Sequence, residues 1–219
     1  MKVPRTRIKV CGLTRASDAQ AAVRAGANAL GVILAPGHRR SLTVKQAAVV
    51  LARVPHNVQR VGVFVDAPLE DVSKAVEQLG LTEVQLHGIE GPMYCASVAV
   101  PVVKTFRIGP GFDPADIERY RGAVAGVLLD TLVEGVAGGS GKSFDYKLAR
   151  DVPRGAPVYL AGGLRPENVR EAVRRLRPAG VDVSSGVEES PGIKSEEKMK
   201  RFVAEVRAAD HENEERARR

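Results

Sequence analysis

Residues 61–65 read VGVFV and residues 126–129 read GVLL, and these two runs decide the fold. Their residues are apolar in succession instead of alternating with polar ones, so both faces of each strand must be covered. Strands of this kind are typical of parallel sheets with helices packed against them. The rest of the chain repeats the same unit, a short β-rich run followed by a helical pattern, from end to end.

Eight such units can be placed along the chain, and we expect the strands at 7–11, 29–34, 60–65, 83–86, 102–106, 126–129, 157–160 and 181–183. The expected helices cover 17–25, 43–53, 69–79, 91–98, 114–120, 144–150, 166–176 and 195–208. Ser17 is predicted as the N-cap of the first helix, Gly26 and Gly80 as stops, and Pro166 as an early helical residue. The pattern predicts one α/β domain over residues 1–209, a (β/α)8 TIM barrel.

The alternative fold is an open, doubly wound sheet. Its nucleotide-binding fingerprint GxGxxG is absent after the first strand, which counts against it. Residues 210–219, DHENEERARR, carry mixed charge with few apolar side chains, and we expect a frayed helix end or a disordered tail.

The composition excludes several classes of protein. No run approaches the roughly 18 apolar residues of a membrane helix, and the basic start MKVPRTRIKV lacks an apolar signal core, so we expect a cytoplasmic protein without a membrane partner. The net charge of +7 is spread along the chain and only 4% of residues are aromatic, which disfavours nucleic acid and suits an anionic metabolite. Cys11, Cys95 and four scattered histidines show no zinc spacing, so no metal is expected.

Catalytic residues of a barrel lie at the C-terminal ends of its strands and in the loops that follow. Cys11 ends the first strand there, and a thiol with a modestly lowered pKa is a usable base near neutrality. The simpler interpretation of Cys11 is a small buried apolar residue. We interpret Cys95 in that way. Asp130 follows GVLL directly, and either anchors its loop or acts as a general acid.

Glycine-rich turns after the seventh and eighth strands predict a phosphate site. Gly162 and Gly163 lie in AGGL, and Ser184, Ser185 and Gly186 lie in SSGV, where a short helix starting near Gly186 could direct its N–H groups at an anion. Ordinary tight turns are the alternative. The run GGSGK at 138–142 lacks the spacing of a P-loop, so we interpret it as a glycine-hinged loop over the site.

Two further side chains belong to the expected rim. Arg40, in GHRRSLT after the second strand, is either a solvated loop residue or a clamp on a substrate carboxylate. His87 ends the fourth strand in QLHG, and either forms a wall of the site or makes a structural hydrogen bond.

Taken together, these motifs resemble the phosphoribosylanthranilate isomerase family of tryptophan biosynthesis. The resemblance runs in order from Ile8 to Phe202 and rests on KVCGLTR, VGVFV, VQLHG, LLDT, GGSGKSFDY, LAGGLRPENV and GVDVSSGVEESPGIKS. Two positions depart from the family pattern: Ile33–Ala35 replaces residues that are usually aromatic, and Tyr146 stands where a tryptophan is usual.

The resemblance implies a barrel that converts N-(5-phosphoribosyl)anthranilate to its 1-deoxyribulose isomer by an Amadori rearrangement, the third step of tryptophan synthesis from chorismate, with no cofactor or metal. Cys11 would be the base that takes the proton from C2′, and Asp130 the acid that protonates the ring oxygen. Arg40 would contact the anthranilate carboxylate, and the backbone around Gly163 and Ser185–Gly186 would hold the phosphate. The protein would be a monomer or a homodimer.

Two other functions are compatible with the same sequence. A related aminoaldose isomerase of histidine synthesis has the same architecture but uses an aspartate at the end of its first strand, where this chain has Cys11. A non-catalytic phosphate-binding barrel would have no need of both Cys11 and Asp130.

Overall fold

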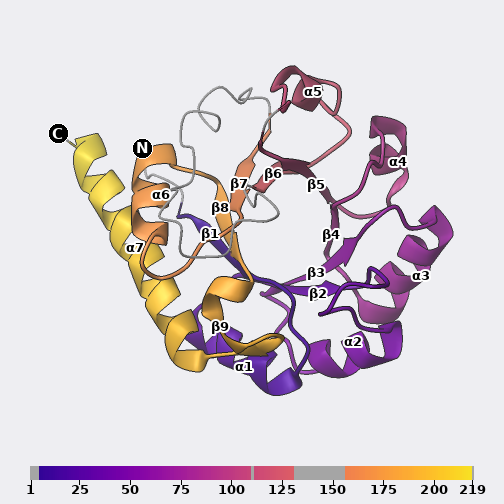
Figure 1. Cartoon of the computed structure of the whole chain (residues 1–219), viewed down its shortest axis with the longest axis horizontal. Coiled ribbons are helices and arrows are strands. Elements are labelled where there is room, and N and C mark those ends of the chain that lie inside the picture. Colours follow the sequence, from indigo (N-terminus) through magenta and orange to yellow (C-terminus); the bar gives the residue numbers. More distant parts are fainter. Residues whose placement is uncertain (1–4, 110, 131–155, 219) are drawn as a thin grey trace.

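The computed structural model describes residues 5–109, 111–130 and 156–218 and places eight parallel strands in a closed barrel (Figure 1). Each strand pairs with the next in sequence, and the last pairs with the first to complete the ring. The strands are β1 (Arg7–Val10), β2 (Ala29–Ile33), β3 (Gln59–Phe64), β4 (Glu83–Leu86), β5 (Val102–Arg107), β6 (Gly126–Asp130), β7 (Val158–Ala161) and β8 (Gly180–Val183).

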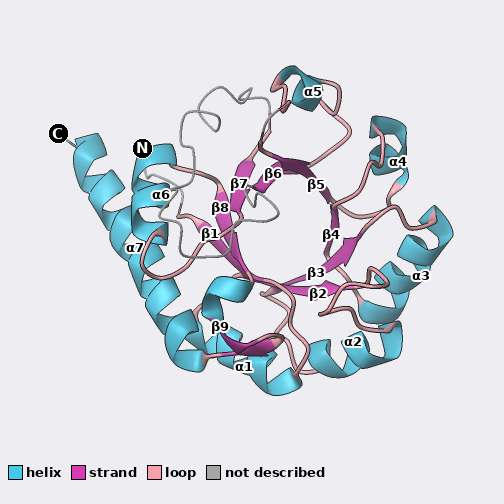
Figure 2. Ribbon diagram, viewed as in Figure 1, coloured by secondary structure: helices cyan, strands magenta, loops and turns pink. Residues whose placement is uncertain are grey.

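Helices form a layer outside this barrel, as Figure 2 shows by colour. They are α1 (Ala16–Ala25), α2 (Val44–Leu51), α3 (Leu69–Leu79), α4 (Pro92–Ser97), α5 (Ala115–Glu118), α6 (Val169–Leu176) and α7 (Glu196–Arg218). Between β8 and α7 come a single 3-10 turn, η1 (Ser185–Val187), and a small hairpin, β9 (Glu188–Ser190) with β10 (Ile193–Lys194).

The TIM barrel predicted from the sequence is confirmed, and the open doubly wound sheet is wrong because β1 and β8 are hydrogen-bonded neighbours. The run VGVFV lies in and just after β3, where the side chains of Val61, Val63 and Phe64 are almost completely buried. Its consecutive apolar residues therefore do face the barrel interior on one side and the helices on the other.

Two predicted helix starts are wrong. The first helix begins at Ala16 with Arg15 as its N-cap, so Ser17 lies inside the first turn and its hydroxyl contacts Asp18 instead. The helix predicted from Pro166 begins at Val169, because the side chain of Asn168 accepts a hydrogen bond from the backbone N–H of Arg165 and stabilises a turn there.

The two predicted helix ends are confirmed. Both α1 and α3 end at a glycine in the left-handed conformation, with φ of 100° at Gly26 and 57° at Gly80. Thr43 and Gln46 form a reciprocal capping box at the start of α2. The helix predicted at 144–150, the run GGSGK at 138–142 and Tyr146 lie outside the described residues.

Residues 210–218, expected to be a frayed helix end or a disordered tail, continue α7 as a helix. Asp210 is buried and accepts hydrogen bonds from the backbone N–H and hydroxyl of Thr6, at the base of β1. The amide of Asn213 donates to the carbonyl of Val173 on α6. Long-range partners thus order a segment whose own sequence shows no apolar face.

Candidate active site

The C-terminal ends of the strands bring the predicted acid and base to one end of the barrel. Cys11 follows β1, and its N–H donates to the carbonyl of Val183 at the end of β8. His87 follows β4, and Asp130 is the last residue of β6. The loops after β7 and β8, predicted to hold phosphate, begin at the same end because all eight strands are parallel.

Cys11 is a free thiol in an apolar surrounding. Its side chain is buried with Ile33 at the end of β2, Ala35 in the loop that follows, and Val63 on β3. Burial raises the pKa of the Cys11 thiol, while the nearby ammonium groups of Lys9 and Lys194 act against that rise. Cys95, by contrast, packs in the core from α4, as expected.

Asp130 lies opposite His87. The Oδ2 atom of Asp130 is 3.3 Å from Nε2 of His87, and both side chains are only partly exposed. The backbone of His87 is held by its main-chain N–H, which donates to the carbonyl of Phe64 on β3. The structure thus adds to the two interpretations of His87 that its imidazole is a polar partner of the candidate acid.

Beneath Cys11, the inside of the barrel contains ion pairs that the sequence reading missed. Lys9 Nζ is 2.7 Å from Oδ2 of Asp182 on β8 and donates to Oε1 of Gln85 on β4 at 2.8 Å. One layer lower, the Arg7 guanidinium donates to both oxygens of Glu83, at 2.7 and 2.9 Å. The available signal was the alternation of Arg7, Lys9 and Cys11 along one strand, which directs all three side chains inward.

The side chain of Arg40 is not exposed to solvent, and part of its guanidinium group is already bound to another residue. It is buried, and its Nε and Nη2 atoms donate to the two carboxylate oxygens of Glu188 at 2.6 and 2.7 Å. Lys194 Nζ lies 3.0 Å from the same carboxylate and also donates to the carbonyl of Ser184. These cations lower the pKa of Glu188 to about 2 despite the opposing effect of burial.

This cluster joins the loop after β2 to the hairpin after β8, and it reaches the residue next to Cys11. A Cβ atom added to Gly12, which follows Cys11, would come within 2.6 Å of Cδ of Arg40 and 3.0 Å of the Ser184 hydroxyl. Gly12 also has a φ of 68°, so a side chain there would be strained in addition. Glu188 and Lys194 were not predicted, since their partner on the second loop is far away in sequence.

The two expected phosphate loops do meet. Gly162 and Gly163 adopt φ of 86° and 62°, the left-handed region that glycine favours. A Cβ atom on Gly186 would lie 1.9 Å from the carbonyl oxygen of Leu164, so the backbones of the seventh and eighth loops are in direct contact. Ser185 and Gly186 form η1, which is the short helix expected at this point.

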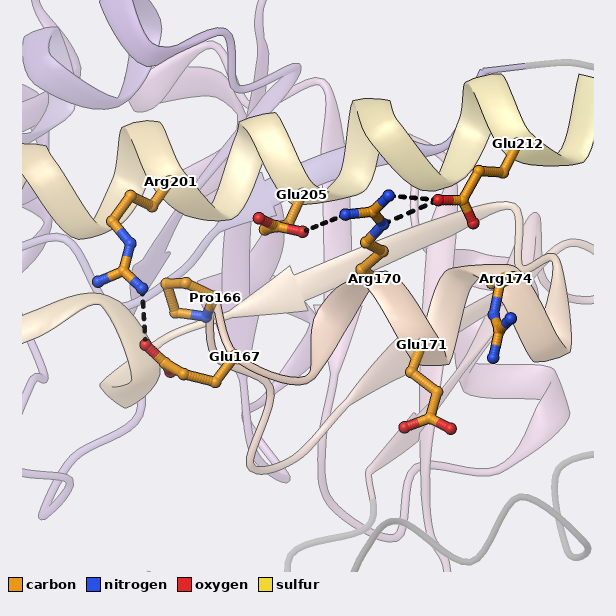
Figure 3. Close-up of a pocket in the computed structure, with 8 residues that line it drawn as sticks. All are labelled: Pro166, Glu167, Arg170, Glu171, Arg174, Arg201, Glu205 and Glu212. Carbon is orange, nitrogen blue, oxygen red and sulfur yellow. Dashed lines mark hydrogen bonds and ion pairs between the residues drawn. The ribbon is translucent and has the colours of Figure 1, made fainter.

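A hollow of about 400 Å³ lies elsewhere, on the outer surface between α6 and α7 (Figure 3). Arg170 pairs there with Glu205 and Glu212, and Arg201 pairs with Glu167. Because the charges of α7 are already paired with opposite charges on α6 and on the turn before it, this surface is a solvated set of ion pairs that joins these segments.

The described part of the chain contains no group of three or more His, Cys, Asp and Glu residues arranged to hold a metal ion. Within the same ranges, no helix combines the length and the apolar composition that crossing a bilayer requires.

Comparison with known proteins gives a consistent result. The family model described as N-(5'phosphoribosyl)anthranilate (PRA) isomerase matches residues 8–205. The N-(5'-phosphoribosyl)anthranilate isomerase of Leptothrix cholodnii is 46% identical over 207 residues, which cover 94% of this chain and 93% of that protein.

Solved structures agree. The phosphoribosyl anthranilate isomerase of Thermotoga maritima has a TM-score of 0.83 at 37% identity, covering 93% of this chain and 99% of that one. A phosphoribosyl anthranilate isomerase in complex with reduced 1-(o-carboxyphenylamino)-1-deoxyribulose 5-phosphate has a TM-score of 0.79 at 34% identity, with the same coverage. Monomers generated from the dimeric Thermotoga maritima enzyme have a TM-score of 0.78 at 33% identity, again with the same coverage.

Proposed function

This chain belongs to the N-(5'-phosphoribosyl)anthranilate isomerase family and catalyses that isomerisation in tryptophan biosynthesis, and we propose that Cys11 and Asp130 are its base and acid. The observation that carries the proposal is the placement of Cys11, His87 and Asp130 at the ends of β1, β4 and β6, at one end of a closed barrel.

The reaction delivers protons to the ring oxygen and to C1′, and removes protons from C2′ and from the 2′-hydroxyl group. Protonation of the furanose oxygen opens the ring and leaves an iminium ion at C1′. Removal of the proton from C2′ then gives an enamine, which tautomerises to the ketone 1-(2-carboxyphenylamino)-1-deoxyribulose 5-phosphate. Each positioned proton transfer typically contributes about 10²–10⁴-fold, and the remaining acceleration comes from how the substrate is held.

Asp130 gives its proton to the ring oxygen in this proposal, with His87 as its partner. The 3.3 Å contact gives the carboxyl group of Asp130 an imidazole as its polar partner, which orients it within the site. After ring opening, the same pair takes a proton back when the enamine becomes the ketone. Cys11 enters this cycle as a thiolate, removes the C2′ proton and returns a proton to C1′ when the ketone forms.

Arg40 remains the proposed contact for the anthranilate carboxylate. Glu188 occupies its Nε and Nη2 atoms and so fixes the plane of the guanidinium, which leaves Nη1 outside that pair to reach the ligand. The phosphate is assigned to the backbone of Gly162, Gly163 and the segment Ser184–Gly186, where left-handed glycines and η1 lie together.

The same proposal covers compartment and assembly. We place the protein in the cytoplasm, where reducing conditions keep Cys11 and Cys95 as the free thiols that the structure contains. It works as a monomer or a homodimer, and sedimentation of the purified protein decides between the two.

Cys11→Ser and Asp130→Asn test the assignment, with Cys95→Ser as the matched control. We expect each of the first two to lower kcat on the anthranilate sugar by at least about 100-fold, followed by the loss of substrate fluorescence. The control thiol packs in α4, so its removal should leave kcat within about twofold of the parent. If both active-site variants keep the parental kcat, the acid–base assignment is wrong.

A further inference from the structure

Lys9 is a lysine buried inside the barrel, and the proposed reaction does not use it. It precedes Cys11 by two residues on β1, so strand geometry places both side chains inside the barrel, one above the other. Only 5% of Lys9 is exposed. Burying an ammonium group costs free energy unless the group is paired, so a lysine at this position needs a physical explanation.

The partners of Lys9 keep it charged. Asp182 Oδ2 lies 2.7 Å away, and Gln85 Oε1 accepts a further hydrogen bond at 2.8 Å. Although burial lowers the pKa of Lys9, the combined interactions with Asp182 and with Cys11 outweigh it and leave the pKa above its ordinary value of 10.5. The barrel interior therefore contains a fixed positive charge directly below the proposed base.

Gly31 shows how close the two groups are. A Cβ atom on this residue of β2 would lie 2.8 Å from Sγ of Cys11 and 3.2 Å from Nζ of Lys9. The sulfur and the ammonium group thus share the space above one glycine. The backbone of Gly31 is not in the left-handed region, so the limited space and not the backbone conformation requires a glycine here.

Other charges also face the thiol. Asp182 on β8 opposes its ionisation, whereas Lys194 on β10 favours it. Glu188 lies against Lys194 and Arg40 and offsets their charge. The pair of His87 and Asp130 lies at the same end of the barrel.

We propose that Lys9 is a positioning residue: its ammonium group, fixed by Asp182 and Gln85, stabilises the thiolate of Cys11 in the space that Gly31 leaves open. This inference rests on the proposed function, in which Cys11 is the base. It has a physical rationale, because burial raises the pKa of the thiol and an adjacent cation opposes that rise.

The test measures ionisation of Cys11 directly. In a Cys95→Ser background, the ultraviolet absorbance of the thiolate is followed against pH in the parent, in Lys9→Met and in the double variant Lys9→Met/Asp182→Asn. The double variant removes both charges and so avoids a buried, unpaired carboxylate. We expect the midpoint to rise by about one pH unit in Lys9→Met, which is a tenfold loss of thiolate near neutrality, and by less in the double variant.

The matched control is Arg7→Met/Glu83→Gln, which removes the ion pair one layer deeper in the same barrel. This control should leave the midpoint unchanged. The lower pH limit of kcat/KM should shift with the thiolate midpoint in the Lys9 variants, a change that a merely structural role would not produce. Gly31→Ala should also shift the midpoint, since its Cβ displaces both groups.

The outcomes separate the two proposals. If the folded double variant and Gly31→Ala both titrate like the parent while Cys11→Ser abolishes turnover, the proposed function stands and the role of Lys9 is refuted. If the midpoint rises as expected but Cys11→Ser keeps the parental kcat, the thiol is coupled to Lys9 but is not the base.

Discussion

Replacing Glu188 with glutamine removes the one anion that two buried cations share. The side chains of Arg40, Glu188 and Lys194 are 6%, 6% and 0% exposed, so solvent screens these interactions little. The pKa of Glu188 falls from its ordinary value of 4.5 to about 2. At about 1.4 kcal/mol per unit this corresponds to about 3 kcal/mol, and breaking a buried pair costs about 3–5 kcal/mol.

The pH dependence follows from the sign of that shift. A carboxylate with a depressed pKa in the folded state stabilises the protein fully above pH 4.5 and loses this contribution as the pH falls towards 2. Glutamine resembles the protonated form of Glu188, so the variant and the parent should converge in acid. We expect a difference in the free energy of unfolding of about 3 kcal/mol at pH 7 and about half that at pH 3.

Urea denaturation followed by circular dichroism at pH 7, 5 and 3 measures this difference. The control is Glu118→Gln, which breaks an exposed ion pair with Arg121 on the outer surface and should cost less than about 1 kcal/mol at every pH. A Glu188→Gln difference below about 1 kcal/mol at pH 7, or one that is equal at pH 7 and pH 3, would refute the reasoning.

Three further perturbations test other parts of the structure. Gly186→Ala drives a methyl group into the carbonyl of Leu164 and should raise KM about tenfold with a smaller change in kcat, as steady-state kinetics would show; an unchanged KM argues against phosphate binding there. Asp210→Ala removes the buried acceptor for Thr6 and should cost about 2 kcal/mol, seen as a lower melting temperature; an unchanged one would mean that this part of α7 adds nothing to stability. His87→Gln keeps a polar group but removes the imidazole beside Asp130, and it should lower kcat about tenfold. A kcat equal to that of the parent would show that His87 has no part in the mechanism.

Local patterns were sufficient to predict the barrel and the positions of its candidate acid and base. Strands such as VGVFV must be covered on both faces, and glycines such as Gly26 and Gly80 end the helices between them. In a parallel barrel, a residue at the end of a strand can lie only at the rim. Cys11 and Asp130 could therefore be assigned to one end of the molecule before any contact was known.

Contacts between distant residues could not be predicted in this way. Arg40 appeared to be a loop residue free to bind a ligand, yet a carboxylate 148 positions later in the sequence holds two of its nitrogens. The end of α7 appeared disordered, yet Asp210 is tied to Thr6 at the other end of the chain.

Periodicity and strand ends are local properties of the chain, and they were enough to predict the barrel, its rim and the pair of candidate catalytic groups. The charges around these groups depend on which distant residues the folded barrel brings together. Lys9 can remain ionised in the barrel because Asp182, 173 residues away, faces it at 2.7 Å. A buried charge depends on its partner, and barrel closure determines which partner that is.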